Sequence, residues 1–245
     1  MNRFSKLALV SLFLSGLFGC ALNWPIRYNM SDITPSSTTQ LKGITLSVEP
    51  FTDSRTSVSE NGIVFTAGRE TKIDGKRVCI NSEKHYNKEP VASQITTAVS
   101  NHLKQRAAFK DVLVNSKSSA DFQLQGSIRQ FYCQQNFSYA AAVGRQIGII
   151  GMLVTMNSKT LGTIKIEFTD LKILGKDGNQ VKALENVIKT FENELPADAS
   201  CWQAFWNANS KLKEVVDLLA ENVEKGLSEI VSTKTDQPKN VSHND

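Results

Sequence analysis

Several short segments of the chain are apolar or alternate between apolar and polar residues, and each is predicted to form a strand. These segments cover residues 44–48, 112–114, 122–128, 164–173 and 181–191. In the fourth segment the apolar phase changes after Phe168, which predicts a bulge near Thr169 and Asp170. Residues 176–179 (KDGN) are typical of a turn, so the fifth segment should return antiparallel to the fourth.

Two longer segments repeat their apolar residues every three to four positions, which is the spacing of an amphipathic helix. The first follows Pro90, a residue that suits a first helical turn, and should run to about Ala107. The second begins near Ser200, which has a capping-box partner in Gln203, and carries its apolar stripe to Ile230. Stripes of this kind are typical of helices that lie on a sheet.

The order of these elements is β-α-β-β-β-β-α, which predicts an α+β fold. Both helices can cover one face of a mostly antiparallel sheet of four to five strands, giving a two-layer sandwich. We assign residues 42–231 to a single domain, with residues 52–88 as an insertion that includes a hairpin around Asp74 and Gly75. Residues 232–245 are polar, and we expect them to form a disordered tail.

The first nineteen residues have the pattern of an export signal. Two basic residues precede an apolar run over residues 7–18, which is too short to form a permanent membrane-spanning helix. The run ends in Leu17-Phe18-Gly19-Cys20, which resembles the lipobox of bacterial lipoproteins. This resemblance implies lipidation of the Cys20 thiol and removal of residues 1–19. Because Ala21 follows the cysteine, it also implies sorting to the periplasmic side of the outer membrane.

Residues 20–41 contain two prolines and a Ser-Ser-Thr-Thr run without apolar periodicity. We expect this segment to be a flexible tether that lets the domain stand off the membrane. Each buried methylene contributes about 0.8 kcal/mol, so two or three acyl chains such as palmitate would hold the domain on a leaflet essentially permanently.

Charge and cysteine content fit this location. The 245-residue chain has a net charge of +4, without the clustered basic face that indicates a nucleic-acid partner. With Cys20 lipidated, an oxidising compartment permits one disulfide among Cys79, Cys133 and Cys201, and their spacing leaves all three pairings open. Neither these cysteines nor the three histidines have ligand-like spacing, so we expect no metal and no cofactor.

Residues 139–154 combine small residues four apart with bulky apolar residues. That spacing lets helix backbones approach closely, but about 16 residues are too few to cross a bilayer. Two interpretations stay open: a contact with a membrane or protein partner, or a buried loop whose glycines relieve crowding. The candidate contact residues are Gly144, Ile147, Gly148, Ile150, Gly151 and Leu153.

Two short segments that come after the lipobox lie at predicted strands. Residues 48–55 (VEPFTDSR) follow the first strand, and residues 120–128 (ADFQLQGSI) include the third. With the element order, they resemble small periplasmic lipoproteins: the lipopolysaccharide-assembly lipoprotein, auxiliary lipoproteins of lipid ABC transporters, and the periplasmic domain of the curli-secretion channel. The resemblance implies an accessory protein of an outer-membrane assembly that transports lipid, lipopolysaccharide or protein. The alternative is a structural or secretion-channel lipoprotein that oligomerises with itself.

Nothing in the sequence predicts catalysis. No serine or cysteine lies in a nucleophile elbow, and there is no zinc-binding helix. The glycines of residues 144–151 lack the lysine of a phosphate-binding loop. Single carboxylates such as Asp53 and Asp170 are more typical of turn caps than of acids in catalysis. We therefore expect a protein that is not an enzyme and acts through an envelope protein partner.

Overall fold

The computed structural model describes residues 28, 30–55, 71–73, 76–80, 90–135, 159–196 and 201–235. These ranges contain one nine-stranded sheet and two α-helices, α4 (Val91–Gln105) and α7 (Cys201–Thr235). A 3-10 turn, η1, covers Lys117–Ser119. The strands are β1 (Thr45–Val48), β2 (Thr52–Asp53), β3 (Thr71–Ile73), β4 (Lys76–Ile80), β5 (Asp111–Val114), β6 (Phe122–Gln135), β7 (Lys159–Gly175), β8 (Gln180–Ala183) and β9 (Val187–Pro196).

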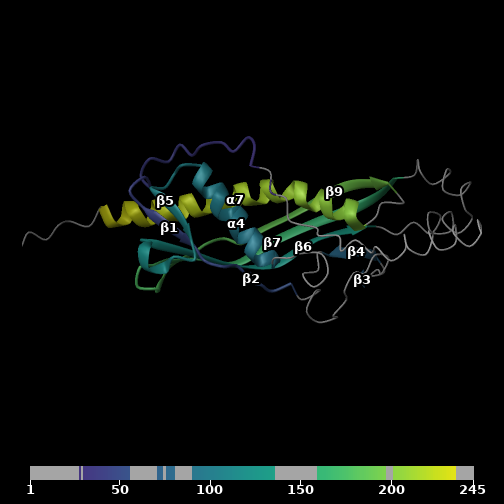
Figure 1. Ribbon diagram of the computed structural model, residues 1–245, viewed down its shortest axis with the longest axis horizontal. Coiled ribbons are helices and arrows are strands. Elements are labelled where there is room, and N and C mark those ends of the chain that lie inside the picture. The colour runs from purple at the N-terminus through teal and green to yellow at the C-terminus, as the bar shows by residue number, and fades with distance from the viewer. Residues whose placement is uncertain are drawn as a thin grey trace, which may run out of the picture.

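The centre of the sheet is the long antiparallel pair β6 and β7, which runs from Phe122 opposite Gly175 to Gln135 opposite Gly162. On its other edge β7 pairs antiparallel with β8 and β9. The remaining edge of β6 is shared by β1 and β2, which are parallel to it, and by β4, which is antiparallel. β5 extends the sheet beyond β1, and β3 extends it beyond β4 (Figure 1).

The predicted α+β class is confirmed, and the elements follow the predicted order. β1, β5, β6 and β7 correspond to the first four predicted strands, and the fifth is divided into β8 and β9. The hairpin predicted around Asp74 and Gly75 is formed by β3 and β4, with Ile73 opposite Lys76. The sheet is mixed, because β1 pairs in parallel with β5 and β6 while the long strands are antiparallel.

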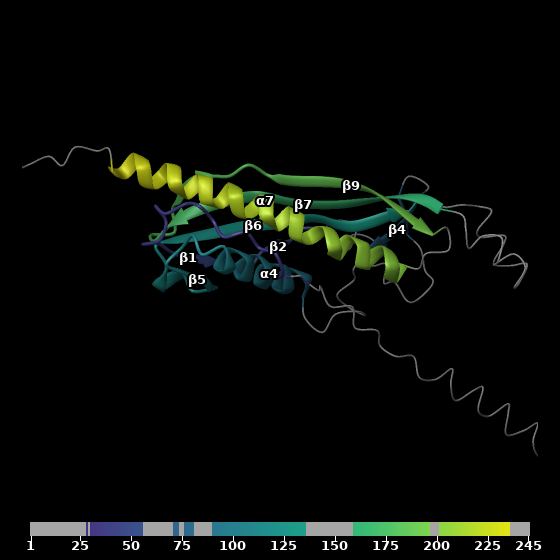
Figure 2. The ribbon, with the colours of Figure 1, turned by 90° about the horizontal axis from the view of Figure 1, so that it is seen from above.

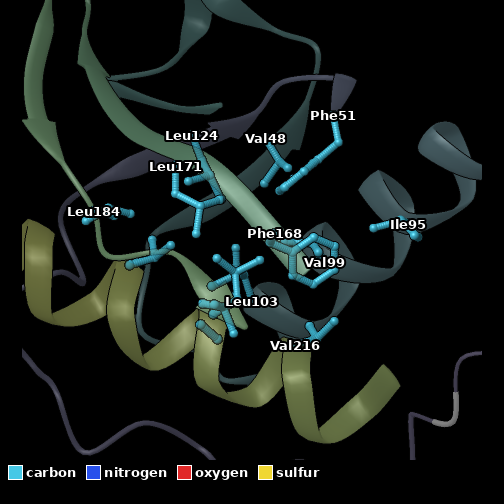
Figure 3. Packing of buried hydrophobic residues seen from close by; sticks show 14 of the residues in the cluster. Val48, Phe51, Ile95, Val99, Leu103, Leu124, Phe168, Leu171, Leu184 and Val216 are labelled. Carbon is cyan, nitrogen blue, oxygen red and sulfur yellow. The ribbon is translucent and has the colours of Figure 1, made fainter. Parts of the chain in front are cut away.

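One hydrophobic core joins both helices to the sheet. α7 lies along β6, β7 and β9, while α4 packs against β1, β2 and β5 and contacts α7 (Figures 1 and 2). Leu103 of α4 and Val216 of α7 are fully buried and approach Leu124 and Phe168 from the sheet (Figure 3). Burial of each such side chain contributes about 1.5–3 kcal/mol. The core therefore holds the two helices in a fixed position relative to each other.

The bulge predicted near Thr169 and Asp170 is confirmed. Gln125 lies opposite Lys172 but Ser127 lies opposite Thr169, so β7 contains one more residue than β6 over this stretch. Asp170 adopts a left-handed φ of 53°, which is uncommon for a residue other than glycine. The extra residue bends the strand at this point.

The helix ends have local causes. Pro90 is the N-cap of α4, whose backbone turns left-handed at Ala107 (φ 54°), so the helix stops close to the predicted position. α7 continues through Thr235, four residues into the predicted tail, where the Ser232 hydroxyl donates to the Ser228 carbonyl at 2.9 Å. The capping-box residue Ser200 lies outside the described residues.

The N-terminal segment lies against the helices. Leu41 is fully buried in the core. The Ser36 amide donates to the Arg106 carbonyl at 2.8 Å, beyond the end of α4. The described end of the segment predicted as a tether is therefore packed on the body of the protein.

Candidate functional site

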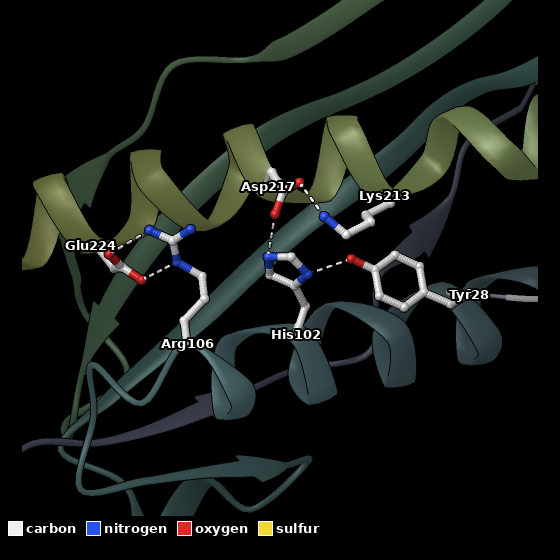
Figure 4. Close-up of polar contacts among 6 residues, drawn as sticks. All are labelled: Tyr28, His102, Arg106, Lys213, Asp217 and Glu224. Carbon is white, nitrogen blue, oxygen red and sulfur yellow. Dashed lines mark hydrogen bonds and ion pairs between the residues drawn. The ribbon is translucent and has the colours of Figure 1, made fainter. Parts of the chain in front are cut away.

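Polar side chains between α4, α7 and the N-terminal segment form one connected cluster, which we call the helix seam. His102 follows Ala98 by four residues and Arg106 follows His102 by four, so all three lie along one side of α4. Figure 4 shows the side chains of His102 and Arg106 directed toward α7. The helix seam consists of Tyr28, Ser36, His102, Arg106, Lys213, Asp217 and Glu224.

His102 is the centre of the helix seam and has no exposed surface. The Tyr28 hydroxyl donates a hydrogen bond to His102 Nδ1, and His102 Nε2 lies 2.8 Å from Asp217 Oδ1. In a neutral imidazole with its proton on Nε2, Nδ1 accepts the hydrogen bond from Tyr28. Nε2 then lies beside the Asp217 carboxylate, in a position too poorly aligned for a hydrogen bond. Lys213 Nζ donates to the other oxygen of Asp217 at 3.1 Å. One histidine thus links the N-terminal segment to α7.

A second link is made by Arg106 and Glu224, which are both nearly buried. Arg106 Nε donates to Glu224 Oε1 at 2.6 Å, and Nη2 donates to Oε2 at 3.1 Å. The Ser36 hydroxyl donates to the same Oε2 at 2.6 Å. This two-pronged pairing is the strongest geometry available to an arginine and a carboxylate. It fixes residue 36 against both helices.

The pKa values in the helix seam reflect burial and these partners. Burial lowers the pKa of His102, and the nearby Arg106 and Lys213 lower it further, while Asp217 and Glu224 act in the opposite direction. The imidazole is therefore neutral at pH 7. Burial, reinforced by the negative charge of Asp217, raises the pKa of the Tyr28 hydroxyl. The hydrogen bond to Glu224 raises the pKa of Arg106.

A cleft of about 490 Å³ opens beside the helix seam. Its walls are the N-terminal segment from Asp32 to Thr38 and the charged residues of α7 and Arg106. The carboxylates of Asp217 and Glu224 in this cleft are already paired with Lys213 and Arg106. Both carboxylates are therefore neutralised by ion pairs within the protein and not by a ligand.

A different cleft of about 370 Å³ lies where β2, β6 and the bulge of β7 meet. Glu49 is 3% exposed, accepts a hydrogen bond from the Ser47 hydroxyl at 2.9 Å, and has Lys117 Nζ at 3.6 Å. We call this second cleft the open-face cleft. Its lining residues include Glu49, Asn115, Lys117, Gln125, Asp170 and Lys172. Two of them, Asn115 (φ 50°) and Asp170, have a left-handed backbone conformation.

The structure describes some of the predicted site residues and not others. Cys20 lies outside the described residues, and so do the six predicted contact residues between Gly144 and Leu153. Cys79 of β4 lies directly opposite Cys133 of β6, and Cys201 is the first residue of α7. No disulfide bond is seen in the described part of the chain.

Sequence reasoning missed the helix seam. The signal for it was the position of His102, seven residues after Ile95 on the apolar stripe of α4, which places an ionisable group on a buried face. Asp53, predicted to cap a turn, accepts a hydrogen bond from the Arg55 amide at 3.3 Å and also forms an ion pair with the Arg55 side chain. Among the described residues, no group of three or more His, Cys, Asp or Glu could hold a metal ion. No described helix is both long and apolar enough to span a membrane.

No protein-family model and no curated protein matches the chain. Among solved structures it is similar to a Xanthomonas campestris protein of family DUF330, with 15% identity, TM-score 0.42, and coverage of 83% of this chain and 93% of that one. It is also similar to the uncharacterized lipoprotein B of Nitrosomonas europaea, with 8% identity, TM-score 0.37, and coverage of 80% and 90%. These scores are too low to assign a shared family or a function.

Proposed function

We propose that the chain is a lipid-anchored periplasmic accessory protein of an outer-membrane assembly that transports lipid, lipopolysaccharide or protein. The observation that carries the proposal is the leader, in which a basic and then apolar stretch ends in Leu17-Phe18-Gly19-Cys20. Lipidation at Cys20 would hold the mature chain on the periplasmic side of the outer membrane.

The helix seam supports this proposal because it would limit the distance between anchor and body. Tyr28 follows Cys20 by eight residues, so a fully extended chain places Tyr28 at most roughly 28 Å from the lipidated residue. Tyr28 is in turn bonded to His102 in the middle of the body. The body would therefore stay next to the leaflet, with the helix seam on the side from which the anchor leaves.

The role proposed is not catalytic. Tyr28, His102 and Asp217 follow one another in the order of a nucleophile, a base and an orienting acid. However, the raised pKa of the Tyr28 hydroxyl disfavours the phenolate that would attack a substrate. His102 also has no exposed surface through which a substrate could reach its ring. The arrangement is better suited to holding three elements together.

The experiment that tests the anchor is metabolic labelling of the full chain with an alkyne analogue of palmitate. We expect label on the wild type and on the matched control Cys201→Ser, and no label on Cys20→Ser. Intact-mass spectrometry should show a mature chain that begins at a lipidated Cys20. An unlabelled wild type, or equal labelling of Cys20→Ser, would contradict the proposal.

The partner contact is tested separately. Deletion of Ile147–Leu153 should abolish crosslinking to an envelope protein while the thermal midpoint stays unchanged. Unchanged crosslinking combined with a lower midpoint would reject this segment as the contact. Light scattering of the detergent-extracted protein addresses the alternative, because the mass of a single chain supports the accessory role and a closed ring supports the self-oligomerising role.

A further inference from the structure

We propose that Cys79 and Cys133 form a disulfide bond in the exported protein, and that Cys201 keeps a free thiol. The proposal rests on the proposed function in one respect, since only an oxidising compartment lets the bond form and persist. The choice among the three pairings comes from the strand register, which the sequence alone did not supply.

The register places the two cysteines directly opposite each other. In the antiparallel pair of β4 and β6, Cys79 is the partner of Cys133, between the pairs Val78–Gln134 and Ile80–Tyr132. Directly opposite residues in such a pair have Cα atoms about 4.5 or 5.5 Å apart. Both separations lie inside the range of about 4.4–6.8 Å that a disulfide bridges.

The same row of the sheet continues into β7 and β9. Cys133 lies opposite Ile164, and Ile164 lies opposite Phe191. Directly opposite residues share a face of the sheet, and Ile164 is 1% exposed in the hydrophobic core. Both cysteines therefore belong to the face of the sheet that α7 covers.

Cys201 is the first residue of α7 and is not part of this row of the sheet. α7 contacts β4 as well as β6, β7 and β9, so the pairing is assigned by strand register. Among the described strands, Cys79 and Cys133 are the two cysteines that are direct cross-strand partners. A bond between them uses both of their thiols and leaves Cys201 as the third, unbridged thiol.

The bond would secure a weakly attached part of the sheet. In the described ranges β3 pairs with β4 alone, and β4 joins the sheet through the four pairs between Arg77–Ile80 and Tyr132–Gln135. A two-stranded hairpin contributes little stability by itself. Oxidation removes two protons and two electrons from the two thiols, and a disulfide oxidant such as glutathione disulfide accepts them as its own S–S bond breaks into two thiols.

Peptide mapping without reduction tests the pairing, because trypsin places each cysteine on its own peptide: 78–84, 130–145 and 190–211. The full chain, extracted from membranes with its thiols blocked by iodoacetamide, should yield peptide 78–84 linked to 130–145, with Cys201 alkylated. A link that involves peptide 190–211 would overturn the proposal.

Thermal unfolding tests the disulfide bond in a second way, through its effect on the thermal midpoint. A reductant should lower the midpoint of the wild type and of Cys201→Ser by roughly 5–15 °C. The midpoint of Cys79→Ser/Cys133→Ser should not respond to the reductant. An equal response of the double variant would contradict the assigned bond.

Reoxidation in vitro tests the cysteine pairing independently of the proposed location of the protein. The reduced full chain in detergent is incubated with glutathione disulfide and mapped in the same way. If this treatment links Cys79 to Cys133 but the chain from cells carries three alkylated cysteines, the pairing stands and the proposed location is wrong. If it leaves Cys79 and Cys133 unlinked, the pairing is wrong whatever the location.

Discussion

The helix seam and the open-face cleft contain similar charged groups, but the two regions hold them differently. In the helix seam, both Arg106 and Glu224 are largely buried and meet through two hydrogen bonds. In the open-face cleft, Glu49 is buried but the side chain of its partner Lys117 is 61% exposed, with a single contact at 3.6 Å. Paired and buried charges fasten elements together, whereas an exposed ammonium group is free to exchange partners.

The largest expected loss of stability comes from a substitution in the helix seam. Glu224→Ala leaves Arg106 buried without its carboxylate, so we expect the free energy of unfolding to fall by about 3–5 kcal/mol. Urea denaturation followed by circular dichroism measures this change. Glu214→Ala is the matched control, because Glu214 is exposed on the same helix and has one 3.9 Å contact with Lys211, so its loss should cost less than about 0.5 kcal/mol. Equal losses for the two variants would show that the pair is not a structural fastening.

His102→Leu should have the next largest effect. It removes the acceptor of the Tyr28 hydroxyl and the group facing Asp217, so we expect a loss of about 1–3 kcal/mol. Tyr28→Phe removes the same hydrogen bond and should cost about 1 kcal/mol. In the His102→Leu background the Tyr28→Phe change should cost much less. Full additivity in this double-mutant cycle would mean that the two side chains do not interact.

The dependence of stability on pH sharpens the comparison further. Since the pKa of folded His102 lies below its usual 6.5, the unfolded chain binds more protons between these two values. The free energy of unfolding should therefore fall as pH decreases below about 6.5. The raised pKa of Tyr28 has the opposite consequence, a loss of stability above pH 10.

Denaturation at a series of pH values measures both slopes. His102→Leu should remove the part of the acid slope that this histidine contributes, and Tyr28→Phe should reduce the alkaline slope. Asp217, Glu224, Arg106 and Lys213 all face the imidazole, and they remain unchanged in both variants. An acid slope that is identical in the wild type and His102→Leu would mean that His102 titrates normally in the folded protein.

The smallest effect is expected in the open-face cleft. Lys117→Ala removes an exposed ammonium group that lies 3.6 Å from Glu49, so stability should change by less than about 0.5 kcal/mol. Differential scanning fluorimetry would then show a shift of less than about 2 °C. A loss as large as that of Glu224→Ala would remove the distinction between the two regions.

Local patterns predicted most of the fold because they report which residues are buried. The phase change after Phe168 located the bulge of β7, and Gly178 adopts the left-handed φ of 82° that the turn sequence required. β6 runs seven residues beyond its predicted end at Ile128. Its additional pairing with β4 joins segments more than fifty residues apart, which periodicity within one segment does not report.

The helix seam could not be predicted from the sequence for a related reason. Its contacts join the N-terminal segment, α4 and α7, and Ser36 and Glu224 are 188 residues apart. The position of His102 on an apolar stripe indicates burial, but the partners that make this burial tolerable come from other elements. The parallel pairing of β1 with β5 and β6 was likewise not apparent from alternation alone.

Hydrogen exchange of the N-terminal segment tests most directly whether the helix seam fastens it to the body. In the wild-type chain extracted from membranes, the Ser36 amide, which donates to the Arg106 carbonyl, should exchange far more slowly than an unstructured amide. Glu224→Ala should speed its exchange, while Lys117→Ala should leave it unchanged. Exchange of Ser36 at the unstructured rate in the wild type would contradict the account.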